Sequence, residues 1–176
     1  ALAELLGYSG EELELVADGA GIGALRMRRN LFPAEALGAE ERAVLRFEQA
    51  GRLDSFAWLK AERTAPKAGE IEIEVAAVGL NFRDILVGLG ILDDDLLGAG
   101  LTAAALGFEC SGIVTRVGEG VENLGIGDAV MGFAANTFAS HLVSPAWHFF
   151  KVPDGVSLEA AATIPVASAT AWFALV

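Results

Sequence analysis

The sequence contains a single cysteine, Cys110, and a single tyrosine, Tyr8. One thiol can form neither an intramolecular disulfide nor the thiolate cluster of a structural zinc site. Basic residues are also scarce, since 12 lysines and arginines face 24 aspartates and glutamates, for a formal net charge of -12. Without a basic surface to neutralise phosphates, we expect neither nucleic acid nor a membrane as partner. These scarcities favour a cytoplasmic location.

Charge is missing altogether from residues 160–176, an apolar run nearly long enough to cross a membrane. Pro165 divides this run, alanine dominates it, and no lysine or arginine follows it to fix an orientation. We therefore expect a helix that belongs in a protein interior. The run reaches Val176 without a cap or a polar exit, which favours a chain that continues beyond this point. The first ten residues carry Glu4 and lack the basic flank of a secretory signal.

The region 1–30 is expected to be an edge segment with a strand near residues 12–16. Its stretch Gly19–Ala24 matches the dinucleotide-binding fingerprint, with alanine at the last position. That fingerprint needs a helix that opens from the glycines, whereas here residues 26–29 run directly into a breaker that ends at Pro33. We therefore favour a hairpin turn over a cofactor loop at this place.

Residues 31–67 are interpreted as a linker with the strand that leads into the next domain. A short helical pattern covers Ala39 to Phe47, and an extended segment follows it. From Glu70 to Val75, glutamates alternate with branched apolar residues, which is typical of a strand with one wet face. Further short strands are expected in four segments separated by turns that contain glycine or proline: 111–117, 128–133, 138–143 and 148–152. This spacing predicts a small barrel or sandwich.

A short helix is expected at residues 81–90, between the first of these strands and the others. Asn81 can cap it, Asp84 can complete a capping box, and Gly90 can end it. With Asn81 and Arg83 at its amino end, this helix could offer hydrogen-bond donors to a developing negative charge. The alternative is a plain helix cap without a chemical role.

Short motifs recur in a fixed order from about Leu53 to Val176. They are Gly79-Leu80-Asn81-Phe82-Arg83-Asp84, Leu106-Gly107-Phe108-Glu109-Cys110-Ser111-Gly112, Val117-Gly118-Glu119-Gly120-Val121, Gly127-Asp128-Ala129-Val130-Met131-Gly132, Val152-Pro153-Asp154-Gly155, Ile164-Pro165-Val166 and Thr170-Ala171-Trp172-Phe173-Ala174-Leu175. This ordered set resembles the enoyl reductase domains of type I polyketide synthases and animal fatty acid synthases. Those domains are zinc-free members of the medium-chain dehydrogenase/reductase superfamily.

The resemblance implies an α/β protein that is mainly β in this chain. Residues 68–155 would form a GroES-like barrel that binds substrate, and residues 156–176 would begin a Rossmann domain whose remainder is missing. Residues 1–30 resemble, less closely, the tail of a preceding structural subdomain. Zinc-dependent relatives carry a histidine beside the glutamate of their Gly-His-Glu motif, where this chain has Phe108. The resemblance therefore implies a reductase without zinc.

The implied activity is the NADPH-dependent reduction of an enoyl thioester held by an acyl carrier protein, inside a megasynthase with other domains. By resemblance, Asn81, Phe82, Arg83 and Thr170 face the nicotinamide, while the missing half holds the rest of NADPH. We expect this chain alone to be inactive. Leu92 stands where many polyketide relatives carry a tyrosine linked to protonation, and leucine cannot donate a proton. The proton donor is thus left unassigned.

Two other functions remain open. A free-standing quinone or enone reductase would belong to the same superfamily, although such enzymes usually begin near the strand at Glu70 and lack a leader such as residues 1–67. A degenerate domain could instead serve as a non-catalytic scaffold within a megasynthase.

The remaining polar residues are interpreted as structural. His141 and His148 are expected to be surface or half-buried histidines, because neither has a partner at metal-ligand spacing. Asp93 to Asp95 lack the spaced oxygens of a calcium loop and are read as a solvated turn. Cys110 has no adjacent base and is expected to be a buried, inert thiol. Asp128 follows Gly127 and is expected to lie in a turn.

Overall fold

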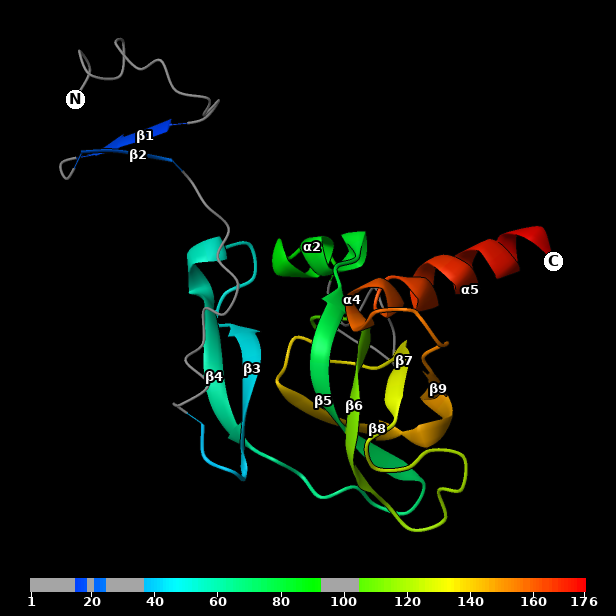
Figure 1. Cartoon of the computed structure of the whole chain (residues 1–176). Helices are drawn as coiled ribbons and strands as arrows, with labels where there is room; N and C mark the ends of the chain where they lie inside the picture. The colour runs from blue at the N-terminus through cyan, green and yellow to red at the C-terminus, as the bar shows by residue number, and fades with distance from the viewer. Residues whose placement is uncertain (1–14, 19–20, 25–36, 93–104) are drawn as a thin grey trace. The chain divides into compact units, whose positions relative to one another are not determined.

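The computed structural model describes residues 15–18, 21–24, 37–92 and 105–176. The chain divides into two compact units, Ala1–Ala36 and Leu37–Val176. In the first unit, strands β1 (Leu15–Asp18) and β2 (Gly21–Ala24) pair antiparallel, with Asp18 opposite Gly21 (Figure 1). The last part of the fingerprint therefore lies on a strand rather than at the start of a helix. The hairpin interpretation is confirmed, and the cofactor loop is excluded.

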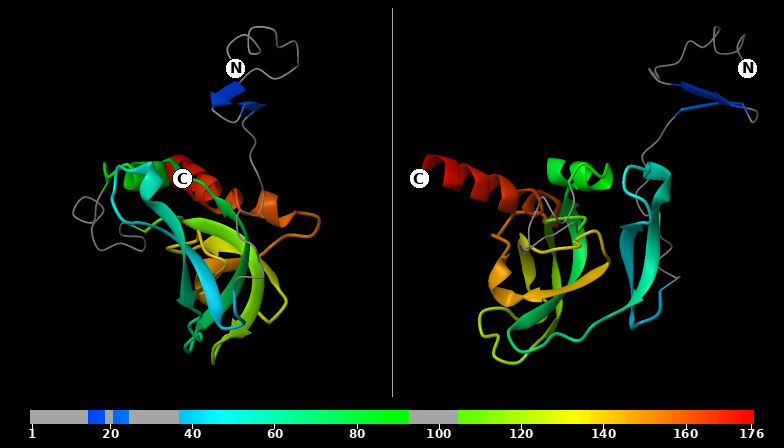
Figure 2. Two further views of the ribbon diagram at one scale, coloured as in Figure 1. Left: turned by 90° about the vertical axis from the view of Figure 1, so that its left-hand side faces the viewer. Right: turned by 180° about the vertical axis from the view of Figure 1, so that it is seen from behind.

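The second unit is built on an antiparallel sheet of five strands in the order β8-β5-β6-β7-β9. Its strands have these bounds: β5 Glu70–Gly79, β6 Glu109–Val117, β7 Ala129–Phe133, β8 His141–Pro145 and β9 Phe149–Lys151. Each overlaps a segment that the sequence predicts to be a strand. The sheet curls around its own apolar face (Figures 1 and 2), so the prediction of a small barrel-like β domain is confirmed.

The core of this unit is made by apolar side chains from every strand of the sheet. Its buried members are Ile71, Ile73, Cys110, Val114, Leu124, Val130, Ala134, Leu142, Ala146 and Phe149. The alternation along β5 places Ile71 and Ile73 in this core and leaves Glu74 exposed, as predicted. Glu72 departs from the pattern because it is 1% exposed. The expected wet face is therefore covered at this position, for a reason given below.

The prediction of a helix at Ala39–Phe47 is wrong. Strand β3 (Glu41–Phe47) occupies this segment and pairs antiparallel with β4 (Phe56–Glu62), and a single 3-10 turn, Leu53–Ser55, precedes β4. Two backbone hydrogen bonds of 2.9 Å, Leu45 N to Phe138 O and Ser140 N to Ala43 O, attach β3 to the chain before β8. Val44, 3% exposed, is buried at this junction. Partners distant in sequence thus override a local helical pattern.

Helices lie at the end of the sheet where β5 finishes (Figure 1). Helix α2 (Phe82–Gly88) follows β5, and α4 (Leu158–Ala161) and α5 (Ile164–Leu175) follow β9; a 3-10 turn, Ala146–His148, joins β8 to β9. The segment Leu158–Leu175 has the length and apolar composition of a membrane span, which for one such segment is weak evidence. The outer part of α5 extends away from the sheet (Figure 2), and Trp172 and Phe173 are 66% and 87% exposed.

Candidate functional site

The candidate site begins where the chain leaves β5 and enters α2. Asn81 is the N-cap of α2, and the buried Asp84 accepts a 2.9 Å hydrogen bond from the Asn81 backbone N–H, which is the half of the predicted capping box that Asp84 supplies. The Asp84 backbone N–H donates to the backbone oxygen of Asn81, also at 2.9 Å. The other oxygen of Asp84 accepts from Gly107 N–H, also at 2.9 Å. Asp84 therefore fixes the first turn of α2 to the loop before β6. The predicted end of the helix is confirmed as well, since Gly90 has a φ of 69° just past the C-cap Leu89.

A second buried carboxylate, Glu109, lies at the start of β6 and is 5% exposed. Glu109 Oε1 accepts a 3.0 Å hydrogen bond from Asn81 Nδ2, and Oε2 accepts a 2.8 Å bond from Val166 N–H in the first turn of α5. Glu109 is paired with Gly79 of β5. One carboxylate thereby connects the cap of α2 to the start of α5. In the sequence, Glu109 only identifies Phe108 as the residue that replaces the zinc-binding histidine of relatives. Nothing in that motif predicts this connecting role.

The side chain of Asn81 is oriented by these contacts. Its Nδ2 also donates to Gly79 O at 3.3 Å, so both amide protons are engaged by Glu109 and Gly79. The backbone N–H of Asn81 is engaged by Asp84. Asn81 therefore does not offer the side-chain donor that the sequence analysis expected for a developing negative charge. The carbonyl oxygen is the amide's remaining polar atom, and it is an acceptor.

The other predicted site residues lie on α2 and α5. Phe82 is 72% exposed, whereas Arg83 donates to Ala105 O at 3.2 Å and lies over the Phe108 ring at 5.7 Å. Thr170 is exposed and lies four residues after Val166, about one turn further along α5. The structure thus brings the two helices that carry these residues to one end of β5.

The predictions for the isolated polar residues have mixed outcomes. Cys110 is fully buried, as predicted, and burial, assisted by the negative charge of Glu109, raises its thiol pKa to about 12. The inertness of the thiol stays a prediction. Asp128 accepts from Gly125 N–H at 2.8 Å within a turn, as predicted. His141 is half-buried as predicted, but His148 is buried, with 7% of its surface exposed, in the turn before β9, which corrects its assignment. Asp93 to Asp95 lie outside the described residues.

Leu92 lies just beyond α2, where its N–H donates to Leu86 O at 3.3 Å. No contact tests its correspondence to the tyrosine of relatives, which stays a prediction.

No cluster of three or more histidine, cysteine, aspartate or glutamate side chains forms within the part of the chain that the structure describes. Phe108, at the position of the zinc-binding histidine, packs instead against Phe133 with the ring centroids 5.7 Å apart. An aromatic pair thus occupies the place where a ligand would be needed. The expectation of a zinc-free protein stays a prediction.

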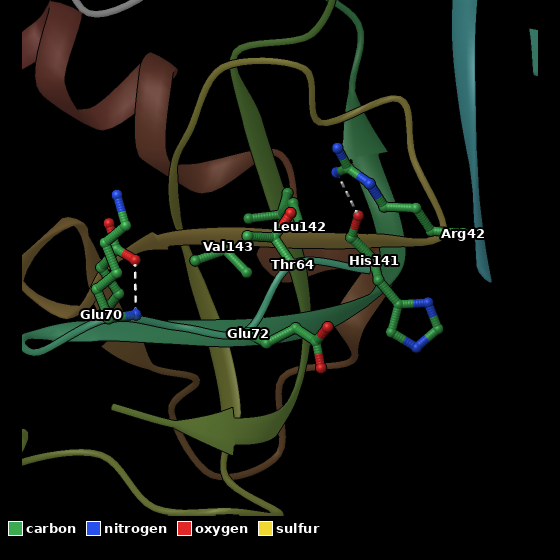
Figure 3. Close-up of a pocket in the computed structure, with 8 residues that line it drawn as sticks. Arg42, Thr64, Glu70, Glu72, His141, Leu142 and Val143 are labelled. Carbon is green, nitrogen blue, oxygen red and sulfur yellow. Dashed lines mark hydrogen bonds between the residues drawn. The ribbon is translucent and has the colours of Figure 1, made fainter. Parts of the chain in front are cut away.

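A polar pocket of about 260 Å³ lies at the opposite end of β5 (Figure 3). Its lining consists of Arg42, Thr64, Lys67, Glu70, Glu72, His141, Leu142 and Val143. Two of its contacts are visible in the figure: Arg42 donates to His141 O at 3.1 Å, and Lys67 N–H donates to the Glu70 carboxylate at 2.9 Å. Since β5 is ten residues long, Glu70 and Gly79 are about 30 Å apart along the strand at about 3.3 Å per residue. The pocket is therefore separate from the Asn81 site.

The carboxylate of Glu72 holds the wall of this pocket together. It accepts hydrogen bonds from Arg63 Nε at 3.0 Å, from Arg116 Nε at 2.7 Å and from Thr115 Oγ1 at 2.7 Å. Burial alone would raise the pKa of Glu72, but hydrogen bonds from Arg116, Arg63 and Thr115 outweigh it and hold the pKa well below its usual range. This network explains why a glutamate is buried on the face predicted to be wet.

An antiparallel sheet curled around an apolar core, with a capped helix after its longest strand, defines the GroES-like substrate domain of a dehydrogenase or reductase. The sequence profile of the alcohol dehydrogenase GroES-like domain matches residues 67–154. The chain belongs to this family, and its relatives place it with the amino-terminal half of the enoyl reductase domains of polyketide synthases.

Three of these relatives show how far the likeness extends. The highly reducing polyketide synthase lcsB of Purpureocillium lilacinum is 38% identical over 72% of this chain, which covers 5% of that protein. The crystal structure of CurK enoyl reductase is 37% identical, with a TM-score of 0.71 over 76% of this chain and 42% of that one. Escherichia coli quinone oxidoreductase, solved with NADPH, is 27% identical, with a TM-score of 0.64 over 76% and 40%. The chain thus spans less than half of each.

Proposed function

We propose that this chain is the substrate-side half of an NADPH-dependent enoyl reductase domain that acts on enoyl thioesters carried by an acyl carrier protein in a polyketide or fatty acid synthase. The observation that carries the proposal is the double anchoring of Asn81, by its backbone to Asp84 and by its side chain to Glu109, beside the first turn of α5. A plain helix cap needs only the first of these anchors. The similarity to CurK enoyl reductase and to polyketide synthases supports the substrate class.

The residues present fit the nicotinamide end of NADPH and not its phosphates. Asn81, Phe82 and Thr170 offer an oriented amide, an exposed ring and a hydroxyl on two helices that lie at one end of the sheet. A net charge of -12 opposes phosphate binding. We therefore expect the phosphates and the adenosine to be held by a nucleotide-binding half that follows α5. The exposed outer turns of α5 are consistent with such a continuation.

When bound, NADPH would supply a hydride to the β carbon of the conjugated thioester. Negative charge that develops on the thioester oxygen requires a donor, and Asn81 does not provide it because its amide protons are engaged by Glu109 and Gly79. Leu92 cannot supply the α proton, so a water molecule or a group in the other half is expected to deliver it. The work of this half is then to orient the cofactor and the acyl chain.

A free-standing quinone reductase is the second candidate, and the likeness to the Escherichia coli enzyme favours it. The higher identity to CurK enoyl reductase, 37% against 27%, argues for the synthase domain. A non-catalytic scaffold remains the third possibility. Activity of the complete domain on enoyl thioesters, compared with activity on quinones, separates all three.

The direct test uses the complete domain, which joins this chain to its nucleotide-binding half. Replacing Asn81 by alanine should lower kcat/KM for a crotonyl thioester by about 100-fold, because a misplaced reactant costs about that much. The matched control is Asn123→Ala on an exposed loop, which should leave kcat/KM unchanged. Equal rates for Asn81→Ala and the parent domain would contradict the proposal. This chain alone should bind NADPH only weakly, and elemental analysis of the complete domain should find no stoichiometric zinc.

A further inference from the structure

The contacts of Glu109 constrain the direction of the hydrogen bonds around it. An ionised carboxylate only accepts hydrogen bonds, so both of its partners must donate. Val166 N–H is a donor by its nature, and the amide of Asn81 must turn its nitrogen toward Glu109, as the 3.0 Å contact shows. The orientation of the Asn81 amide is therefore dictated by chemistry as well as by position.

Gly79 on the neighbouring strand β5 leaves room for the Glu109 side chain because it has no Cβ atom. A Cβ atom added at Gly79 would lie 2.5 Å from Glu109 Cγ and 2.6 Å from Cδ, closer than real Cβ contacts allow. The carbonyl of the same residue accepts the second amide proton of Asn81 at 3.3 Å. Gly79 thus both admits the carboxylate and helps to orient the amide. If the Glu109 side chain only filled space, neither the room left by Gly79 nor the hydrogen bond to its carbonyl would be needed.

We propose that Glu109 is a positioning residue, which holds the Asn81 amide so that its carbonyl oxygen is left to accept a hydrogen bond from a cofactor hydroxyl or amide N–H. The same carboxylate ties this orientation to the first turn of α5 through Val166. Binding at α5 and the direction of the Asn81 amide are therefore coupled through one side chain. This inference rests on the proposed function and deepens it, because it states which kind of group Asn81 recognises.

Substitutions that keep the shapes of both side chains test the proposal in the complete domain. In Glu109→Gln, the introduced amide oxygen can satisfy only one of the two donors, and its nitrogen faces the other. We expect kcat to fall about 10- to 100-fold and the Kd of NADPH to rise, because the Asn81 amide loses its fixed direction. Asn81→Asp should also be impaired, because it sets two carboxylates against each other.

The double variant Asn81→Asp/Glu109→Gln reverses the hydrogen bond without changing the net charge. The introduced amide donates to the introduced carboxylate and still accepts from Val166 N–H, while residue 81 keeps an acceptor oxygen for the cofactor. Only the longer 3.3 Å contact with Gly79 O loses its donor. We expect kcat and the Kd of NADPH to recover to within about fivefold of the parent values. The control Glu122→Gln, on an exposed loop, should match the parent in both quantities.

Each contrary result overturns the proposal. Unchanged kcat and NADPH Kd in Glu109→Gln would show that Glu109 orients nothing. A lower melting temperature with unchanged kcat would assign it a structural role only. If the double variant regains the parent melting temperature but remains as impaired as Asn81→Asp, the Asn81 amide acts as a donor and the acceptor assignment is wrong.

Two readouts do not depend on turnover, so failure of the proposed function can be recognised separately. NADPH binding followed by the fluorescence of the bound nucleotide reports the cofactor contact. Hydrogen exchange of the Val166 amide reports the bond to Glu109, and it should be slow in the parent and faster in Glu109→Ala, which removes the acceptor. If the parent domain reduces no enoyl thioester, the proposed function fails, while these two readouts still decide the role of Glu109.

Discussion

Two buried carboxylates with different surroundings lie near the two ends of strand β5. Near its amino end, Glu72 is 1% exposed and is bound by two guanidinium groups, those of Arg63 and Arg116. Beside its carboxyl end, on β6, Glu109 is 5% exposed and accepts hydrogen bonds from an uncharged amide and a backbone N–H. One carboxylate is compensated by cations, and the other is held by oriented neutral donors.

The difference between these ends indicates what each does. Charge compensation around Glu72 joins β5 to Arg63, which follows β4, and to Arg116 of β6, so it fastens parts of the fold to one another. Polar side chains line most of the pocket (Figure 3), and Arg63 provides the Glu72 carboxylate with a partner from within the protein. The donors around Glu109 instead fix the direction of one amide beside two helices. Burial alone therefore does not identify a functional carboxylate, whereas the nature of its partners does.

Removing the compensated carboxylate should have the largest effect on stability. Glu72→Ala leaves Arg63 and Arg116 without their shared partner, and we expect the free energy of unfolding to fall by about 3 kcal/mol. Urea denaturation followed by fluorescence measures this change. Glu74→Ala on the exposed side of the same strand is the matched control and should cost less than about 0.5 kcal/mol. A loss below about 1 kcal/mol for Glu72→Ala would mean that the cluster behaves as a surface ion pair.

At the other end of β5, the most damaging small change should be Gly79→Ala. The added methyl group overlaps Glu109, so either the carboxylate or the strand must shift. We expect a loss of about 1 to 3 kcal/mol in unfolding free energy, as for overpacked cores. In the complete domain, the loss of activity should exceed what the fraction of folded protein explains.

Gly125→Ala provides the control, since a Cβ atom there would meet only Asp128 Oδ2, at 3.8 Å, and its φ is not in the left-handed region. Both variants are compared by thermal unfolding and by NADPH turnover. If Gly79→Ala is as stable and active as Gly125→Ala, the close fit around Glu109 has no consequence.

The sequence predicted the parts of this fold whose signals are local. Strands β5 to β9 follow from short apolar segments between turns, and α2 follows from Asn81, Asp84 and Gly90. Strand β3 was missed because its own residues carry a helical pattern, whereas it is held by pairing with β4 and by hydrogen bonds to residues 138–140, which are distant in sequence. The burial of Glu72 depends in the same way on Arg63 and Arg116.

The sequence predicted where α2 begins but not the geometry around Asn81. The motif that contains Asn81 located the start of α2 correctly, yet nothing local shows that the amide protons are already engaged by Glu109 and Gly79. Glu109 lies 28 residues after Asn81, and the two meet only because β6 pairs with β5. Hydrogen-bond direction at a site arises from such pairings, which a motif does not contain.

Acid should weaken the Glu72 end of the molecule. Because the folded-state pKa of Glu72 lies below its ordinary value of 4.5, its contribution to stability is complete above that pH and is lost as the pH falls toward the folded pKa. The unfolding free energy of the parent should thus decline between about pH 5 and about pH 3 more steeply than that of Glu72→Gln. Urea titrations at several pH values measure the two slopes. Equal slopes would show that Arg63 and Arg116 do not lower the pKa of Glu72.

The smallest expected effect concerns Cys110, which directly follows Glu109. The reactivity of its thiol tests whether solvent reaches the interior of the sheet next to Glu109. The thiol is fully buried, and burial together with the charge of Glu109 raises its pKa to about 12. Since the thiolate is the reactive form, the native protein should not react with a disulfide reagent near neutral pH over hours, whereas the urea-unfolded protein should react within minutes. Titration with a chromogenic disulfide, before and after unfolding, measures the difference.

The Glu72→Ala variant should react slowly in its folded state, because its defect lies nearer the other end of β5. Gly79→Ala should react faster than the parent, since Val78 and Gly79 pair with Cys110 and Glu109. Rapid labelling of the native parent would show that the Glu109 end is open from behind.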